Sequence, residues 1–132
     1  YDGQLTYEEH GLFEVCDLGA WWMQRTGLPL PLGGNTIKTD VDERFGIGAT
    51  DKITSLLLQS IEYAMDHREK SLLWAAKWGR GIDVECTDEF VEMYVNKWTL
   101  DFKDRGREAV YRFLSDAAKV GALQEIETIT FV

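Results

Sequence analysis

Apolar residues recur every three or four positions through much of the chain, which is the spacing of one face of an α-helix. The clearest case covers residues 51–65, whose apolar face contains Ile53, Leu56, Leu57, Ile61, Ala64 and Met65. Similar spacing predicts further helices over residues 68–78, from Thr87 onward, and over residues 104–120. We therefore expect residues 36–132 to be mainly helical.

We predict three short strands: residues 11–16, where Leu12, Phe13 and Val15 are apolar, and residues 35–39 and 128–132, where apolar and polar residues alternate. Three short strands are too few for a stable sheet unless they pair with one another, with sequence outside this chain or with a second chain. The expected fold is therefore α/β and mainly helical, within a larger unit. The chain also lacks an initiator methionine, which favours a fragment or a processed product.

A short helix is predicted just before the most unusual segment of the chain. Asp17 is a candidate N-cap, since its carboxylate can accept a hydrogen bond from an unpaired amide of the first turn. The helix then runs to about residue 25 and ends at Thr26-Gly27. At least one ring of the Trp21-Trp22 pair is expected to face the core.

The segment that follows combines two prolines with two glycines. Pro29 and Pro31 fix φ and remove two amide donors, so residues 28–32 are expected to be extended and outside the middle of a sheet. Gly33 and Gly34 have no Cβ and allow another group to approach the backbone closely. This pattern is typical of the wall of a ligand site, and equally of a strand that enters a tight turn.

Composition and charge narrow the function classes. The 132 residues include five tryptophans and are 45% hydrophobic, enough for one domain with a sizeable core. The 23 acidic and 14 basic side chains give a net charge of −9, which repels phosphate backbones, so no nucleic-acid partner is expected. Neither a signal-peptide pattern nor an apolar window of membrane-spanning length occurs. We expect a cytoplasmic protein with no membrane partner.

The other candidate chemical groups favour structural roles. Cys16 and Cys86 form no metal-binding or redox motif and are expected to be buried apolar residues. Residues 46–50 precede a helix whose free amides could bind an anion, but they lack P-loop spacing, so a plain turn and cap is favoured. Glu8-Glu9-His10 reads as a solvated turn, because adjacent side chains project in different directions. No metal site is expected.

Several motifs carry a resemblance to a known family. They are Asp17-Leu-Gly-Ala-Trp-Trp, Thr26-Gly-Leu-Pro-Leu-Pro-Leu-Gly, Gly3-Gln-Leu-Thr-Tyr, Tyr94-Val-Asn and the final Phe131-Val132. With these motifs the chain resembles the later half of the 1,4-dihydroxy-6-naphthoate synthase family of menaquinone biosynthesis. The resemblance implies the C-terminal portion of a two-lobed, type-II periplasmic-binding-protein-like fold. Residues 1–35 would connect the lobes and line the ligand cleft, and residues 36–132 would complete the first lobe.

The resemblance also implies a reaction and its site. Family members cleave a carbon–carbon bond in cyclic de-hypoxanthine futalosine without a metal or organic cofactor, which makes them lyases. Tyr1 occupies the position of the family's proton-transferring histidine, whereas Leu32 and Gly33 would line the cleft. A tyrosine with a pKa of about 10 is a poor base at neutral pH.

Two readings other than a catalytic fragment remain open. The first is a non-catalytic protein that binds a small-molecule ligand on the same scaffold, in which Tyr1 contacts the ligand without transferring protons. The second is an acidic helical interaction module, which gains weight if these 132 residues are the whole protein. As a catalytic fragment, this chain alone is expected to be inactive. It would need either a missing N-terminal lobe or self-association to complete the cleft.

Overall fold

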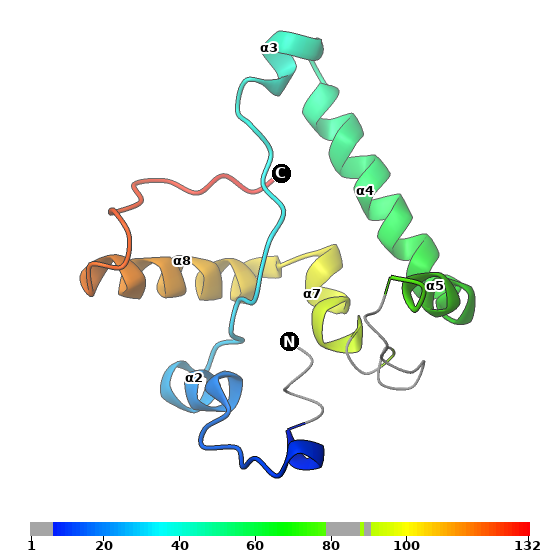
Figure 1. Cartoon of the computed structure of the whole chain (residues 1–132). Coiled ribbons are helices and arrows are strands. Elements are labelled where there is room, and N and C mark those ends of the chain that lie inside the picture. Colours follow the sequence, from blue (N-terminus) through cyan, green and yellow to red (C-terminus); the bar gives the residue numbers. More distant parts are fainter. Residues whose placement is uncertain (1–6, 79–87, 89–90) are drawn as a thin grey trace.

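The computed structural model describes residues 7–78, 88 and 91–132, and its regular elements are helices. Figure 1 shows them in chain order: the 3-10 helix η1 (Glu8–His10) and the α-helices α2 (Leu18–Thr26), α3 (Val41–Phe45), α4 (Ala49–Asp66), α5 (Arg68–Ala75), α7 (Lys97–Leu100) and α8 (Lys103–Lys119). Residues 91–94 are helical as well. The predicted helix start at Thr87 lies outside the described residues.

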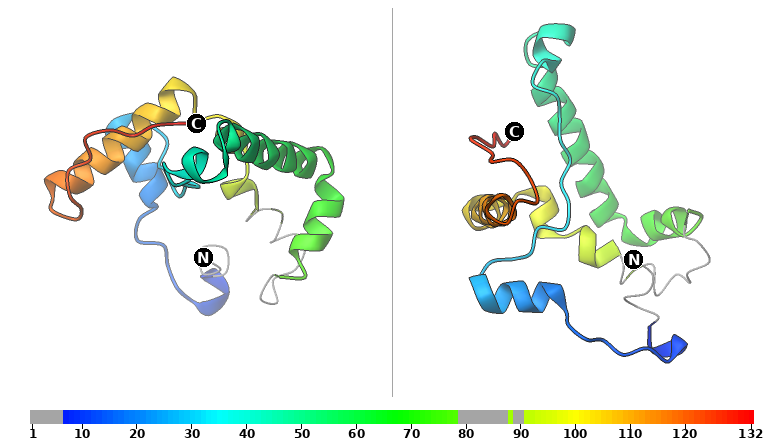
Figure 2. Two further views of the ribbon diagram at one scale, coloured as in Figure 1. Left: turned by 90° about the horizontal axis from the view of Figure 1, so that it is seen from above. Right: turned by 60° about the vertical axis from the view of Figure 1, so that its left-hand side comes forward.

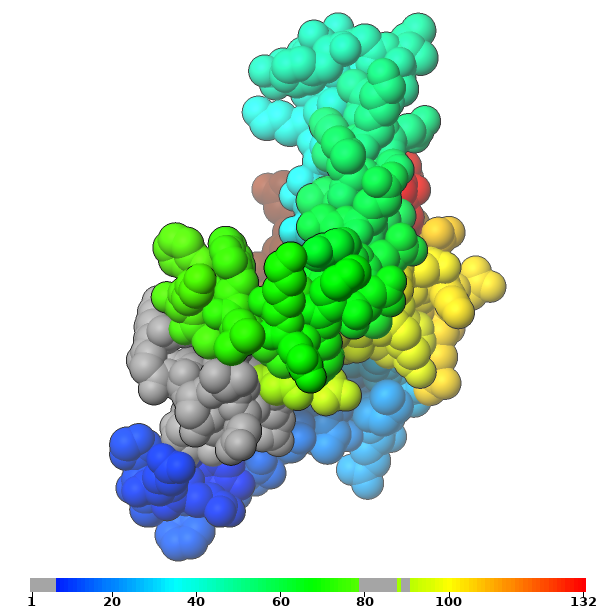
Figure 3. All heavy atoms as spheres, turned by 90° about the vertical axis from the view of Figure 1, so that its right-hand side faces the viewer, coloured from blue at the N-terminus to red at the C-terminus, as the bar shows by residue number. Residues whose placement is uncertain are grey.

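The helices form an open arrangement around two long members, α4 and α8. Helix α4 packs against α3, α5 and α7. Helix α2 lies on the other side of the molecule and contacts α8, while the extended residues between α2 and α3 cross from one side to the other (Figures 1 and 2). The N-terminal end of α4 and the adjoining α3 stand out from the rest of the chain in the space-filling view of Figure 3.

Local sequence explains where α2 begins and ends, and a break at His67 separates α4 from α5. The Asp17 carboxylate accepts a 2.9 Å hydrogen bond from the amide of Ala20, as expected of an N-cap, and Gly27 ends α2 with a positive φ of 71°. Helix α4 ends at His67, whose backbone is non-helical with φ −116° and ψ 44°, and α5 begins at the next residue. Both boundaries of α2 agree with the sequence-based prediction to within one residue.

The α/β prediction is wrong, although its mainly helical part is correct. No strand occurs within the described residues, and the segments 11–16, 35–39 and 128–132 are irregular. Alternating sequence makes a strand only when a neighbouring extended backbone supplies hydrogen-bond partners, and none does so here. The last of these segments is held by side chains instead, since Tyr111 donates a 2.7 Å hydrogen bond to the carbonyl of Ile129. The structure therefore does not support a periplasmic-binding-protein-like fold for this chain.

The described part of the chain has a small core. Its buried apolar residues are Trp22, Leu28, Val41, Leu72 and Ala109. Helix α4 contains no buried residue over its 18 positions, and its apolar Leu56 and Leu57 are exposed. Cys16, expected to be buried, is exposed, and Cys86 lies outside the described residues. The sizeable core expected from composition is therefore not formed by these residues on their own.

Candidate functional site

The candidate site is the extended segment after α2, and its first part is anchored to the body of the molecule. Trp22 is only 6% exposed, and its ring meets that of Phe113 on α8 edge-on at 5.6 Å between centroids. The indole Nε1–H of Trp22 donates a 3.2 Å hydrogen bond to the carbonyl of Pro29. Proline lacks an amide donor but keeps its carbonyl, so this bond uses the backbone group that Pro29 has available.

The turn between α2 and the segment is held by hydrogen bonds on both sides of Gly27. The Thr26 hydroxyl donates to the carbonyl of Trp22 at 2.8 Å and accepts from the amide of Leu28 at 3.1 Å. The carbonyl of Gly27 accepts a 2.6 Å hydrogen bond from Nη2 of Arg105, which lies 78 residues away on α8. Leu28 is buried at this point. The beginning of the segment is therefore fixed to both α2 and α8.

The later part of the segment is uncovered. Leu32 is 60% exposed, and a Cβ added at Gly33 or Gly34 would meet no atom within 4 Å. No contact in the described structure requires glycine at these two positions, and neither has a positive φ. The segment does not form a strand that enters a tight turn, which was the alternative interpretation of this pattern. The structure leaves Leu32 and Gly33 accessible to a ligand or to another part of a larger protein.

Tyr1, the third residue predicted for the site, lies outside the described residues. The structure therefore brings Leu32 and Gly33 together as neighbours in one exposed segment and gives no position for Tyr1 relative to them. Sequence reasoning did not find Arg105, because a side chain that contacts a backbone carbonyl 78 residues away leaves no local pattern. Trp22 was identified only as one member of a pair with a ring toward the core.

The possible anion site before α4 is filled by the protein's own carboxylate. Asp42 of α3 accepts hydrogen bonds from the amide of Thr50 at 2.8 Å and from the amide of Gly48 at 3.2 Å. These hydrogen bonds lower the pKa of the Asp42 carboxyl from its usual value, with those from Thr50 having the larger effect and the one from Gly48 the smaller. The turn-and-cap interpretation is thus correct, with Asp42 as the capping group.

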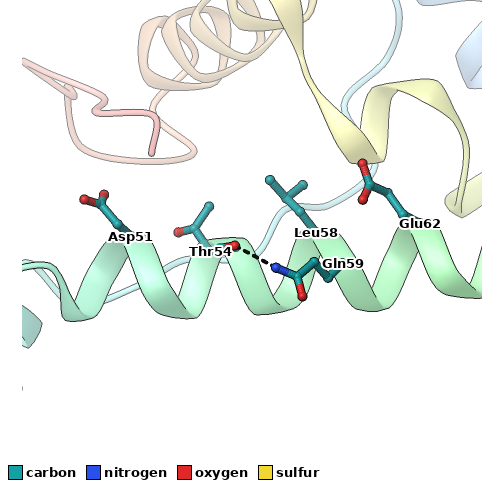
Figure 4. Close-up of a pocket in the computed structure, with 6 residues that line it drawn as sticks. Asp51, Thr54, Leu58, Gln59 and Glu62 are labelled. Carbon is teal, nitrogen blue, oxygen red and sulfur yellow. Dashed lines mark hydrogen bonds between the residues drawn. The ribbon is translucent and has the colours of Figure 1, made fainter.

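Neither a metal site nor an enclosed ligand pocket is found among the described residues. Within the described residues, no group of three or more His, Cys, Asp or Glu side chains is arranged to hold a metal ion. A depression along α4 is lined by side chains of that single helix, with Asp51, Thr54, Leu58 and Glu62 projecting from it (Figure 4). Gln59 there donates a 3.0 Å hydrogen bond to Ser55, also on α4. A surface built by one exposed helix does not enclose a ligand, so this region is the face of α4 and not a cleft.

The fold and the site define an open helical chain that presents one anchored and partly uncovered extended segment. Comparison with known proteins then identifies its family. A model of the menaquinone biosynthesis family matches residues 1–119, and the chain belongs to this family. None of the described helices is both long enough and apolar enough to cross a membrane.

Two curated relatives carry the same enzyme name. The chain is 35% identical over 121 residues to the 1,4-dihydroxy-6-naphthoate synthase of Thermus thermophilus, covering 92% of this chain and 43% of that protein. It is 28% identical over 121 residues to the 1,4-dihydroxy-6-naphthoate synthase of Streptomyces coelicolor, covering 92% and 42%. The chain thus spans less than half the length of the relatives it matches.

Proposed function

We propose that this chain is the C-terminal part of an enzyme that forms 1,4-dihydroxy-6-naphthoate from cyclic de-hypoxanthine futalosine by cleaving a carbon–carbon bond. The observation that carries the proposal is the 35% identity to a naphthoate synthase over nearly the whole chain. The family's role in menaquinone biosynthesis agrees with it. The expected cytoplasmic location is part of the same proposal.

The candidate segment supports a role in ligand binding. Its first residues are anchored through Pro29 and Gly27, whereas Leu32 and Gly33 are uncovered. An apolar side chain and a bare backbone, held by a rigid support, suit contact with a planar apolar ligand. We propose that Leu32 supplies apolar contact and that Gly33 allows the ligand to approach the backbone. Tyr1 is proposed to lie at the same site.

The remainder of the site is proposed to come from sequence that precedes this chain in a longer protein. The relatives are more than twice as long as the part that matches, and α4 leaves Leu56 and Leu57 exposed. The first test is the intact mass of the protein from its natural source. A mass about twice the 15.1 kDa of this chain is expected, in line with domains of roughly 100–150 residues. A mass of 15.1 kDa would contradict the enzyme proposal and favour a binding protein whose cleft is completed by self-association.

The second test is turnover by the full-length protein, measured as 1,4-dihydroxy-6-naphthoate released from cyclic de-hypoxanthine futalosine. We expect turnover by the full-length protein and none by the 132-residue chain alone. Leu32→Ala is expected to raise KM about tenfold, the usual effect of removing a few methylene contacts from an apolar pocket. Ile47→Ala is the matched control, since Ile47 is also exposed but lies in the turn before α4. Equal effects of the two substitutions would contradict a specific role for Leu32.

A second candidate function is a binding protein that has lost catalysis. The residue that favours it is Tyr1, because a tyrosine with a pKa of about 10 does not act as a base at neutral pH. In that case the full-length protein binds the substrate without converting it. Tyr1→His would then restore turnover, whereas turnover by the unsubstituted protein would exclude this candidate.

A further inference from the structure

Two hydrogen bonds from different helices hold carbonyl groups two residues apart at the start of the candidate segment. Trp22 of α2 binds the carbonyl of Pro29, and Arg105 of α8 binds the carbonyl of Gly27. One hydrogen bond leaves an extended segment free to pivot about it. Two bonds from separate supports fix both its position and its direction.

The position of Arg105 follows from the way α8 begins. Gly106, the next residue, is buried and packs against Phe102 and Trp98, and a Cβ there would lie 3.0 Å from Cβ of Phe102. Side chains at successive helical positions point in directions about 100° apart, because the helix has 3.6 residues per turn. With Gly106 directed inward, Arg105 lies at the exposed edge of α8 and reaches the carbonyl of Gly27.

The hydrogen bond from Arg105 connects the segment to α8, and no contact between neighbouring residues can do the same. Gly27 adopts φ 71°, and its amide donates to the carbonyl of Met23, as at many helix ends. These contacts stay within α2 and its turn, and they do not relate the segment to α8. Trp22 contacts α8 through its ring, which packs against that of Phe113, and such a ring contact is less directional than a hydrogen bond. Arg105 therefore adds the directional contact between α8 and the segment.

We propose that Arg105 is a positioning residue that fixes the course of residues 28–33 by holding the carbonyl of Gly27. Its importance for turnover rests on the proposed function, in which Leu32 and Gly33 contact the ligand. Arg105 acts through the backbone of the segment and does not itself touch the ligand. Removal of its guanidinium loosens the segment and moves Leu32 away from its binding position.

The test compares Arg105→Met, Arg105→Lys and Arg112→Ala in the full-length protein. Arg112 is the matched control, because it is also an exposed arginine on α8 but its side chain pairs with Asp116 at 2.7 Å instead of with the segment. The first readout is hydrogen exchange of the Trp22 indole N–H, identified by its loss in Trp22→Phe. This proton is bonded to Pro29 and reports the segment whether or not the protein is catalytic. The second readout is KM and kcat with cyclic de-hypoxanthine futalosine.

Arg105→Met is expected to speed exchange of the Trp22 indole proton about three- to tenfold, the range for loss of one ordinary hydrogen bond. It should raise KM by a similar factor with kcat less affected, and Arg105→Lys should restore part of both effects. Arg112→Ala should change neither. Unchanged indole exchange in Arg105→Met, or an equal change in Arg112→Ala, would overturn the proposal. Faster exchange in a protein that has no turnover would support the positioning role and contradict the proposed function.

Discussion

Gly106 offers a direct test of how α8 packs, because two opposing effects of Gly106→Ala can be weighed against each other. Gly106 is buried in the first turns of α8, where alanine is the better helix former. In an open helix, replacing glycine by alanine would stabilise the protein by about 1 kcal/mol. The structure predicts the opposite sign for this position.

The reason is the space around the new methyl group. An added Cβ would lie 3.0 Å from Cβ of Phe102 and 3.3 Å from Cε3 of Trp98. The Cβ of Phe102 is attached directly to the backbone and cannot rotate away, so α8 or the residues before it must shift. Overpacking of this kind costs about 2 kcal/mol, which exceeds the gain in helix propensity and leaves a net loss of about 1 kcal/mol.

The measurement is the free energy of unfolding of the full-length protein, from urea titration followed by circular dichroism. Ser115→Ala is the control, since Ser115 is exposed on the same helix and its replacement tests propensity without packing. That control should stabilise the protein by about 0.5 kcal/mol. A gain of about 1 kcal/mol in Gly106→Ala would refute the reasoning, because it would mean that no close contact with Phe102 and Trp98 exists.

Two further predictions concern the ends of elements. Asp42→Asn should reduce the helix content of α4, measured by circular dichroism, because the carboxylate that accepts from Gly48 and Thr50 loses its charge. The folded-state pKa of Asp42 is lowered, so its stabilising effect should be present above about pH 4 and be lost as pH falls through the folded-state pKa. A difference between the two proteins that does not shrink as pH falls below about 4 would contradict this. Tyr111→Phe removes the hydrogen bond to Ile129 and should speed proteolysis of residues 123–132 about threefold, since one exposed hydrogen bond contributes about 0.5–1 kcal/mol. Unchanged cleavage would mean that the ring contacts of Phe131 hold this segment without the hydroxyl of Tyr111.

The helices could be predicted from sequence because their causes are local. The apolar spacing of residues 51–65 corresponds to α4, and the predicted helix over residues 104–120 corresponds to α8 at Lys103–Lys119. Asp17 and Gly27 act as the predicted cap and terminator of α2. Each of these signals involves residues within a few positions of one another.

The errors and omissions have non-local causes. Strands were predicted from local sequence at residues 11–16, 35–39 and 128–132, but a strand needs a partner that local sequence does not specify. Helix α3 is not among the predicted helices, and its Asp42 reaches amides six and eight residues later. An acidic residue shortly before a glycine-containing turn is the signal that could have indicated this cap.

The candidate site was predicted in part. The prolines and glycines of residues 28–34 correctly indicated an extended segment outside any sheet, and Leu32 is exposed as a ligand contact requires. The role of Leu32 and Gly33 stays a prediction, as does that of Tyr1. Arg105 and the hydrogen bond from Trp22 to Pro29 appeared only in the folded structure, because both connect groups through space.

The two prolines also protect the chain in a way unrelated to any ligand. An extended segment whose later part is exposed, as it is at Leu32, would ordinarily be a template for pairing with another chain, which is a common start of aggregation. Pro29 and Pro31 remove two successive amide donors from one edge of the segment, so an incoming strand finds no continuous ladder of hydrogen bonds along that edge. The segment can therefore present the apolar side chain of Leu32 to solvent while resisting β-sheet pairing along this edge.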